Sequence, residues 1–272
     1  AMRKANIGVA MGSGTDVAKE VGSMIITDDN FSSIVAGVEE GRFAYDNVRK
    51  VISFLLGTGL GTVLLIVSSV VMDMPLPLLA VQLLWLNLVT NGIQDVALAF
   101  EKGEHDVMQR QPRDPKETIF NKQMIYNTIV AGVWTGIVAI GFWYYLTNVR
   151  GYTDETQLPY ARSLLLLLCV FLQNMHVLNS RSERRSAFSV PISNNYLLIG
   201  GLFLALGIHN LAMQLPFMQK VLHISPATLQ DFLLAFGLAS TLLIVFEIYK
   251  LLSHSVQKRS INNMIKNIAA QS

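Results

Sequence analysis

One apolar stretch of the sequence carries a cluster of oxygen-bearing side chains: Leu-Asn-Leu-Val-Thr-Asn-Gly-Ile-Gln-Asp, residues 86–95. Amide, hydroxyl and carboxylate oxygens are the groups with which hard cations replace their hydration water. A carboxylate within an apolar stretch is also a candidate functional group, because its burial is costly. The candidate cation ligands in this stretch are Asn87, Thr90, Asn91, Gln94 and Asp95.

The spacing of these residues predicts that they gather on one side of a helix. Asn87, Asn91 and Asp95 are four residues apart, so they share a helical face, and Thr90 and Gln94 lie beside it. The neighbouring glycine at position 92 is expected to interrupt the helix and free backbone carbonyls for a ligand. The alternative is that the amides only join helices, as they do in membrane bundles. Five polar residues together with a carboxylate favour an ion path, although Asp95 is near enough to the end of the stretch to lie at the membrane interface.

Two threonines upstream extend the candidate set. Thr58 and Thr62 are four residues apart, among Gly57, Gly59 and Gly61. The glycines permit close helix approach and local unwinding. Simple packing explains this pattern equally well, so both interpretations stay open.

Further polar residues occur in later apolar stretches. Gln173 is a candidate ligand, because an amide oxygen suits hard cations. His176 is expected to form an interhelical hydrogen bond, and His209 is assigned to packing. Glu247 is expected to have a structural role, pairing with a basic residue of a neighbouring loop.

Composition indicates which elements position these side chains. The chain has 272 residues, of which 51% are hydrophobic and only 15% charged, whereas soluble domains carry about 25% charged residues. Its formal net charge of +2 does not indicate a nucleic-acid partner. Its single cysteine, Cys169, excludes an internal disulfide and a multi-cysteine metal site. We therefore expect an all-α polytopic membrane protein.

A membrane helix needs roughly 20 mostly apolar residues, and six stretches meet this requirement. They are residues 51–71, 75–95, 124–147, 163–180, 196–217 and 228–249. Lysine and arginine are concentrated in alternate loops, which predicts that both termini are cytoplasmic. The basic residues on that side are Arg42, Arg49, Lys50, Lys102, Arg110, Arg113, Lys116, Lys122, Arg181, Arg184, Arg185, Lys250, Lys258, Arg259 and Lys266.

The first fifty residues have a different pattern. Short apolar runs at 7–11 and 24–26 alternate with helical segments, as in a parallel α/β sheet. Thr15 or Ser13 is expected to cap the first helix. This α/β remnant is too short to be a domain, so its sheet is expected to continue upstream. The second helix has no strong breaker between Phe31 and Val71, which predicts a rod of about 60 Å.

The turn Gly12-Ser13-Gly14 between the first strand and the first helix has two interpretations. A glycine-rich turn at a helix start can bind phosphate, but the dinucleotide pattern needs a third glycine where Val17 stands. No P-loop Gly-Lys-Ser/Thr follows either. A tight strand-to-helix turn is therefore favoured.

Several of these segments resemble P-type cation-transporting ATPases of the calcium-pump and sodium-pump branch. The N-terminal segments resemble the end of the phosphorylation domain, and the stretch around Asn87 and Asn91 resembles the cation-binding sixth membrane helix. The resemblance extends to about residue 255. The matching segments are 5–12, 15–19, 27–31, 83–92, 178–180 and 247–250.

The resemblance implies a domain organisation and a function. Residues 1–45 would be the end of the phosphorylation domain and the stalk, 46–253 the C-terminal transmembrane domain with membrane helices five to ten, and 254–272 a cytoplasmic tail. The implied function is ATP-driven cation transport, in which a cytoplasmic aspartate is phosphorylated by ATP with Mg²⁺. The chain has no Asp-Lys-Thr-Gly-Thr motif and no Thr-Gly-Glu-Ser motif, so residues outside it would bind ATP and Mg²⁺.

The implied partners and location follow from the same resemblance. The partners are the transported cation, the lipid bilayer and the remainder of the pump: helices one to four and the actuator, nucleotide and phosphorylation domains. The implied location is a multi-pass protein of the cell (plasma) membrane.

The candidate site departs from the calcium pumps that it resembles. Their sixth helix has an aspartate where Asn91 stands, and their fifth has an asparagine and a glutamate at Gly59 and Thr62. Their eighth helix has a glutamate where Gln173 stands. The remaining negative charge, on Asp95, is too small for two buried calcium ions. We expect one divalent cation, Ca²⁺ or another, or a monovalent cation such as Na⁺ or K⁺.

A second class of function is a passive six-helix ion channel or a secondary transporter. Inverted repeats would mark a secondary transporter, yet the asparagine-rich second span has no counterpart in the fifth. A purely structural membrane anchor is a third option, and the polar stretch argues against it.

Overall fold

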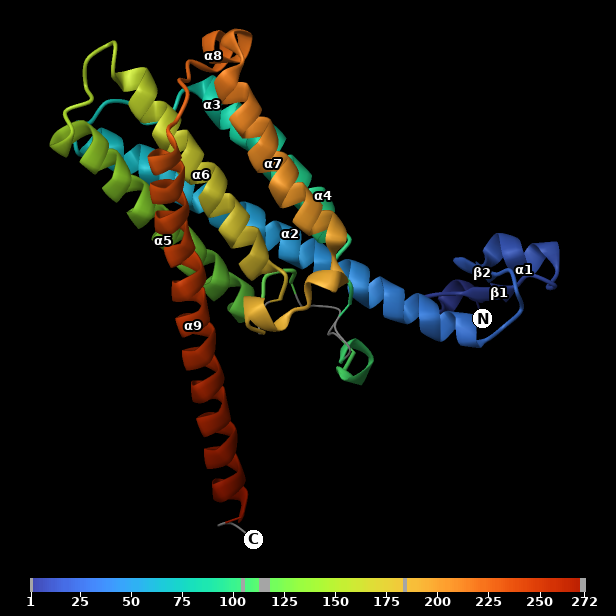
Figure 1. The fold of residues 1–272 in the computed structure, drawn as a ribbon. Helices are drawn as coiled ribbons and strands as arrows, with labels where there is room; N and C mark the ends of the chain where they lie inside the picture. The colour runs from blue at the N-terminus through green and yellow to red at the C-terminus, as the bar shows by residue number, and fades with distance from the viewer. Residues whose placement is uncertain (1, 104–105, 113–117, 183–184, 270–272) are drawn as a thin grey trace. The chain divides into compact units, whose positions relative to one another are not determined.

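The computed structural model describes residues 2–103, 106–112, 118–182 and 185–269, with side chains as far as residue 253. The chain is mostly helical and separates into two units, residues 1–46 with 103–115, and residues 47–102 with 116–272. Figure 1 labels the main elements. Arg113, Lys116 and Arg184, which the orientation prediction uses, lie outside the described residues. The side chains of the predicted tail, 254–272, lie outside them too.

The first unit contains the predicted β-α-β pattern. Its strands pair in parallel, with Val9 opposite Met24 and Met11 opposite Ile26. Thr15 caps the intervening helix, because its hydroxyl accepts a hydrogen bond from the Ala18 amide at 3.4 Å. The elements are η1 (Met2–Lys4), β1 (Val9–Met11), α1 (Asp16–Val21), β2 (Met24–Ile26) and the 3-10 turn η3 (Val107–Gln109). The predicted alternation is confirmed for these residues.

The Gly12–Gly14 turn is held by its own chain. The Gly12 amide donates to the Ile26 carbonyl at 2.7 Å, and a Cβ at Gly12 would lie only 2.9 Å from that oxygen. The Ser13 amide donates to both carboxylate oxygens of Asp29, at 3.0 and 3.2 Å. The hydrogen bonds from Ser13 lower the pKa of the Asp29 carboxyl below its ordinary value. A carboxylate therefore occupies the N–H group that a phosphate would need, which favours the tight-turn interpretation.

Helix α2 (Ser32–Val71) is continuous over 40 residues, as predicted. Its start is set by Asn30, whose Oδ1 accepts from the Ser32 amide at 3.0 Å. At 1.5 Å per residue the helix is about 60 Å long.

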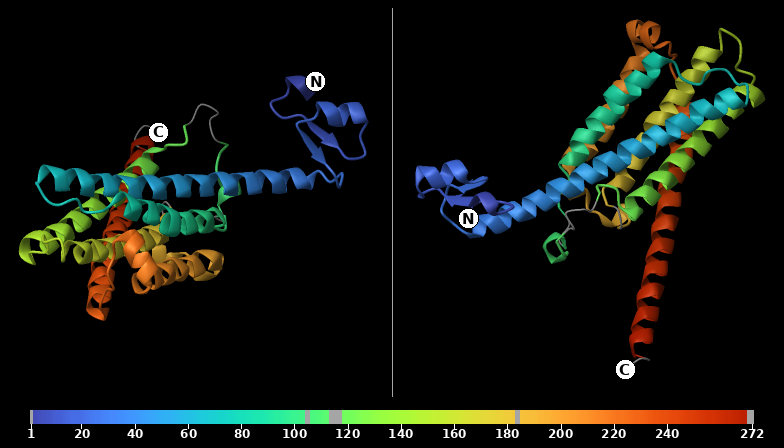
Figure 2. Two further views of the ribbon diagram at one scale, coloured as in Figure 1. Left: turned by 90° about the horizontal axis from the view of Figure 1, so that it is seen from above. Right: turned by 180° about the vertical axis from the view of Figure 1, so that it is seen from behind.

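The second unit is a bundle of long helices around α6 (Figure 2). Almost every α6 side chain is buried, and the helix packs against α5, α7 and α9. After α2, the unit contains α3 (Ala80–Trp85), η2 (Leu86–Asn91), α4 (Gly92–Ala99), α5 (Lys122–Tyr144), η4 (Tyr145–Val149), α6 (Leu158–Ser180), η5 (Ala187–Ser189), η6 (Ile192–Asn194), α7 (Tyr196–Gln214), α8 (Pro216–Leu222) and α9 (Leu229–Ala269).

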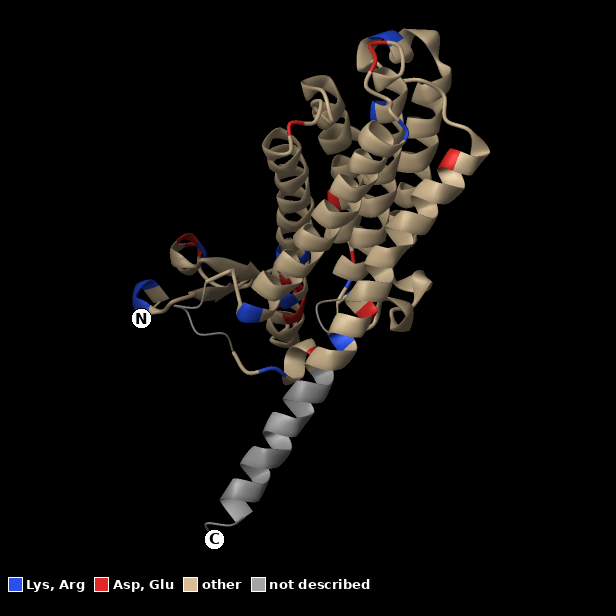
Figure 3. Cartoon of the chain, turned by 90° about the vertical axis from the view of Figure 1, so that its left-hand side faces the viewer, with Lys and Arg blue, Asp and Glu red and all other residues tan. Residues whose placement is uncertain are grey.

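Five helical segments among the described residues are long and apolar enough to cross a membrane. They are Ser32–Val71, Lys122–Val149, Leu158–Ser180, Tyr196–Gln214 and Leu229–Ser253. Charged residues lie mainly near the ends of the bundle's helices (Figure 3). Large apolar side chains are exposed between these ends, including Phe203 at 74% and Leu88 at 71%, as expected where lipid replaces water.

Two predicted spans differ from the observed helices. The stretch 75–95 is not one regular helix, because α3, η2 and α4 divide residues 80–99 into three short pieces. The stretch 196–217 is not one helix to its end, because α7 stops at Gln214 and α8 begins at Pro216. Proline disfavours a helical residue before it, and Leu215 is extended.

Candidate cation-binding site

The polar stretch lies on a helix that is widened rather than broken. Residues 86–91 form the π-helix η2, and the Gly92 amide still donates to the Asn87 carbonyl. Gly92 itself has helical dihedral angles, so the prediction that it interrupts the helix is wrong. The distortion lies in the residues just before it. Single π-helical turns occur frequently at functional sites.

The side chains of the widened turn and of the start of α4 differ in burial. Thr90 and Gln94 are fully buried and Asn91 is 5% exposed, whereas Asn87 is exposed and Asp95 lies between these extremes. The predicted face through residues 87, 91 and 95 is therefore not the buried one. The buried row passes through positions 90 and 94, with Asn91 at its edge.

Most of the buried oxygens of this stretch have no hydrogen-bond partner in the described part of the chain. They are Thr90 Oγ1, Asn91 Oδ1, Gln94 Oε1 and Asp95 Oδ1. Such an atom costs about 1–3 kcal/mol of desolvation, and most buried polar atoms in proteins are paired. Side chains within the stretch do satisfy some donors: the Asn91 amide donates to Asn87 Oδ1 at 3.0 Å. The unpaired groups are oxygens, which are potential cation ligands.

Helix α6 contributes to the same region. It packs against η2 and α4, and Gln94 Nε2 donates to Asn174 Oδ1. The preceding residue, Gln173, is 6% exposed and its Oε1 also has no described partner. The structure thus links Gln94 to the segment that carries Gln173. Asn174 was not among the predicted ligands, although it forms a polar pair with Gln173 in the sequence.

Thr58 and Thr62 are bonded to their own helix. The Thr58 hydroxyl donates to the Phe54 and Leu55 carbonyls at 3.1 and 3.0 Å, and the Thr62 hydroxyl donates to the Thr58 carbonyl at 3.0 Å. Among the hydrogen bonds of the described residues, none joins either threonine to the polar stretch. Their role as ligands stays a prediction.

The glycines beside these threonines do permit close helix approach. A Cβ at Gly57 would lie 2.5 Å from His176 Nε2 of α6, and one at Gly61 would lie 2.6 Å from Thr135 Cγ2 of α5. Gly59 has open space around it. The predicted close approach of helices is confirmed at Gly57 and Gly61.

The two histidines behave differently from each other. His176 is 3% exposed and lies between the rings of Phe54 and Phe246, at centroid distances of 5.3 and 5.8 Å. Neither of its nitrogens has a hydrogen-bond partner among the described residues, so the predicted interhelical hydrogen bond is wrong. His209 does form one, because its Nδ1 accepts from Trp85 Nε1 at 3.1 Å.

The candidate donor set is neutral apart from one carboxylate. No group of three or more histidine, cysteine, aspartate or glutamate residues that could hold a metal occurs in the described ranges. Asp95 supplies the negative charge of the polar stretch, and amides and hydroxyls supply the rest. Such a set of oxygens suits one hard cation and provides little charge compensation for two divalent ions.

Comparison with known proteins gives consistent similarities. A family model described as cation transporting ATPase, C-terminus, matches residues 75–252. The chain is 36% identical over 242 residues to the calcium-transporting ATPase of Bacillus subtilis (strain 168), which covers 88% of this chain and 26% of that protein. It is 31% identical over 276 residues to the endoplasmic reticulum calcium ATPase srcA of Aspergillus fumigatus, covering 92% of this chain and 28% of that protein. The chain thus spans about a quarter of the length of these curated relatives.

Proposed function

The chain belongs to the cation-transporting ATPase family, and from this premise we propose that it is the C-terminal transport part of an ATP-driven cation pump. The observation that carries the proposal is the set of buried, unpaired oxygens on η2, α4 and α6. Thr90, Asn91, Gln94, Asp95 and Gln173 supply them, and in the proposal they hold the transported cation. Asn87, Thr58 and Thr62 complete the proposed ligand set.

The proposed cargo is a single cation. The two relatives are named as a calcium-transporting ATPase and a calcium ATPase, and Ca²⁺ is the first candidate on that ground. The single carboxylate of the stretch supports one divalent cation, or a monovalent one such as Na⁺ or K⁺, over two calcium ions.

The membrane topology is part of the proposal. The pieces α3, η2 and α4, residues 80–99, together form a sixth membrane crossing that overlaps the predicted span 75–95. Both termini face the cytoplasm of a cell whose plasma membrane holds the protein. Residues 1–45 belong to the phosphorylation domain and stalk, and 46–253 form the transmembrane domain. The remainder of the pump supplies helices one to four and the residues that bind ATP and Mg²⁺.

The test is phosphorylation of the intact protein by ATP, measured ion by ion with Ca²⁺, Mn²⁺, Na⁺ and K⁺. We expect one of these cations to stimulate phosphoenzyme formation. Asn91→Leu should raise the concentration of that cation needed for half-maximal phosphorylation (K0.5), since it removes an unpaired oxygen. Asn148→Leu, on exposed η4 residue Asn148, is the matched control and should leave K0.5 unchanged.

The same measurement can also contradict the proposal. If phosphorylation of the intact protein ignores every cation tested, the pump proposal fails. Cation flux through vesicles without ATP would then support the channel alternative, which family membership disfavours.

A further inference from the structure

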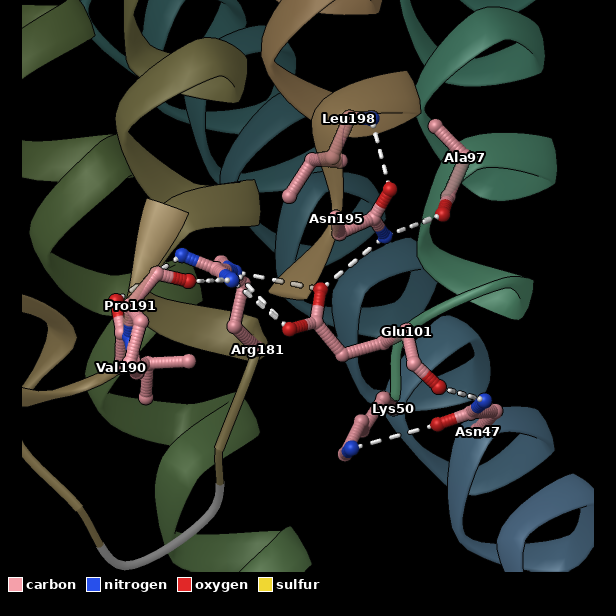
Figure 4. A network of polar contacts seen from close by, with 9 residues as sticks. All are labelled: Asn47, Lys50, Ala97, Glu101, Arg181, Val190, Pro191, Asn195 and Leu198. Carbon is pink, nitrogen blue, oxygen red and sulfur yellow. Dashed lines mark hydrogen bonds and ion pairs between the residues drawn. The ribbon is translucent and has the colours of Figure 1, made fainter. Parts of the chain in front are cut away.

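The carboxyl end of α4 is enclosed by a network of buried polar side chains from four helices and their connections (Figure 4). At its centre, Glu101 and Arg181 form an ion pair with an N–O distance of 2.8 Å, and each side chain is 2% exposed. The Arg181 Nε also donates to both carboxylate oxygens of Glu101, at 3.2 and 3.1 Å. The pair is therefore bidentate, a geometry that fixes direction as well as distance.

Two asparagines bind the last carbonyls of the same helix. Asn195 Nδ2 donates to the Ala97 carbonyl at 2.7 Å and to Glu101 Oε2 at 3.0 Å. Asn47 Nδ2, from α2, donates to the carbonyls of Ala99 at 3.0 Å and Glu101 at 2.7 Å. The Ala97 carbonyl also accepts from the Phe100 amide at 3.3 Å, and Glu101 lies just beyond the last residue of α4. The asparagine amides therefore add partners at the place where the hydrogen bonds of the helix run out.

The network also reaches the elements around α4. Asn195 Oδ1 accepts from the Leu198 amide at 2.8 Å, so one side chain joins the end of α4 to the start of α7. The Arg181 guanidinium donates to the carbonyls of Val190 and Pro191 at 3.3 and 2.8 Å. Next to these groups, a small apolar cluster again unites α2, α4, α6 and α7. Its buried members are Phe54, Ala97, Leu98, Val177 and Leu198.

We propose that the Glu101–Arg181 pair, with Asn47 and Asn195, is a positioning device that holds the carboxyl end of α4 and so sets the position of the cation ligands Gln94 and Asp95. The inference deepens the proposed function and rests on it. None of the four residues touches the cation in this proposal.

The network and the proposed ligands lie close together along α4. Ala97, whose carbonyl Asn195 holds, lies two residues after Asp95, about 3 Å along the helix axis. The preceding π-helical turn is a local departure from regular helix. The buried network holds α4 from its carboxyl end, beyond that turn.

Measuring both thermal stability and cation affinity distinguishes a positioning role of the network from a merely structural role. The intact protein is measured as wild type, Glu101→Gln, Arg181→Met, the double variant, and Leu167→Ala. The last removes a fully buried α6 side chain as a control for stability loss. The readouts are the thermal midpoint and the K0.5 of the cation that stimulates wild-type phosphorylation.

Each single variant should lower the midpoint and raise K0.5 by about five- to tenfold, the lower end of the usual range for coupled sites. The double variant removes both charges, so the midpoint should return toward wild type while K0.5 stays raised, because α4 remains unanchored. Leu167→Ala should lower the midpoint alone. If the single variants do not accumulate as folded protein, the K0.5 of the double variant tests the inference.

The inference is overturned if the double variant has the wild-type K0.5, or if the shifts match those of Leu167→Ala. A wild-type protein whose phosphorylation responds to no cation overturns the proposed function itself, and this inference with it. A responsive wild type with an unaltered double variant overturns only the positioning role.

Discussion

The middle and the carboxyl end of one helical segment bury polar groups in opposite ways. In the middle, the oxygens of Thr90, Gln94 and Asp95 have no hydrogen-bond partner in the described residues. At the end, the Glu101 carboxylate accepts hydrogen bonds from both Arg181 and Asn195. Buried polar networks that are fully satisfied make a structure rigid, whereas an unpaired buried group needs a separate explanation. The pairing state, and not burial alone, distinguishes Thr90, Gln94 and Asp95 from the network around Glu101.

The start of the segment resembles its end. Gln82 is fully buried, its amide donates to the Leu222 carbonyl at 3.0 Å, and its Oε1 accepts from the Leu79 amide at 2.9 Å. Residues 80–101 are therefore held at both ends by paired groups, with the unpaired oxygens between them. This arrangement is what a cation site between two fixed points requires.

The largest expected effect comes from breaking the ion pair between Glu101 and Arg181. Arg181→Met leaves the Glu101 carboxylate buried without its cation, which should reduce the free energy of unfolding by about 3–5 kcal/mol. The thermal midpoint of the intact protein in detergent measures this loss. Arg185→Met, at exposed Arg185, is the matched control and should change stability by less than about 0.5 kcal/mol. Equal midpoints for the two variants would contradict the structural role of the ion pair.

Substitution of an unpaired side chain in the middle of the segment should change cation affinity and not stability. Asp95→Asn removes the proposed charged ligand, so K0.5 for the transported cation should rise about tenfold or more, corresponding to about 1.4 kcal/mol per factor of ten. The thermal midpoint should hardly change, because Asp95 Oδ1 accepts no described hydrogen bond. Phosphorylation as a function of cation concentration is the measurement.

Asp231 is the control for this carboxylate. It accepts hydrogen bonds from the Tyr160 hydroxyl at 2.7 Å and the Thr228 amide at 2.8 Å. Asp231→Asn should therefore lower the midpoint and leave K0.5 unchanged. The distinction between the clusters fails if Asp95→Asn destabilises the protein as Asp231→Asn does without affecting K0.5.

The sequence predicted the broad fold because apolar stretches and turn residues are local signals. Long α2, the parallel strands and the Thr15 cap all follow from neighbours in sequence. The π-helical turn at 86–91 was not predictable from spacing, since a four-residue repeat presupposes a regular helix. Spacing alone also did not show that the buried row passes through Thr90 and Gln94 instead of the face that contains Asn87.

The supporting network was missed for a related reason. Glu101 and Arg181 are separated by 80 residues, and each stands in a loop-like, charged segment that suggests exposure. Only the packing of α4 against α6 and α7 brings these residues together and excludes water from them. Long-range pairing of this kind has no local sequence signal.

The smallest expected effect concerns the Thr90 hydroxyl. Its removal compares the effect of one buried oxygen on stability with its effect on cation affinity. Thr90→Val keeps the shape of the side chain and removes a buried oxygen without a described partner. Since an unsatisfied polar group is unfavourable, stability should stay constant or increase by up to about 1 kcal/mol. If that oxygen binds the cation, K0.5 should rise by roughly fivefold, equivalent to about 1 kcal/mol.

Thr58→Val is the matched substitution on α2, where the hydroxyl already donates to the Phe54 and Leu55 carbonyls. Its effect on K0.5 should be smaller than that of Thr90→Val, because its hydroxyl proton is bound within its own helix. A Thr90→Val variant that loses stability and keeps its K0.5 would place Thr90 with the paired, structural groups. The opposite result, affinity lost at no cost to stability, is expected only of a side chain whose buried oxygen is reserved for a ligand.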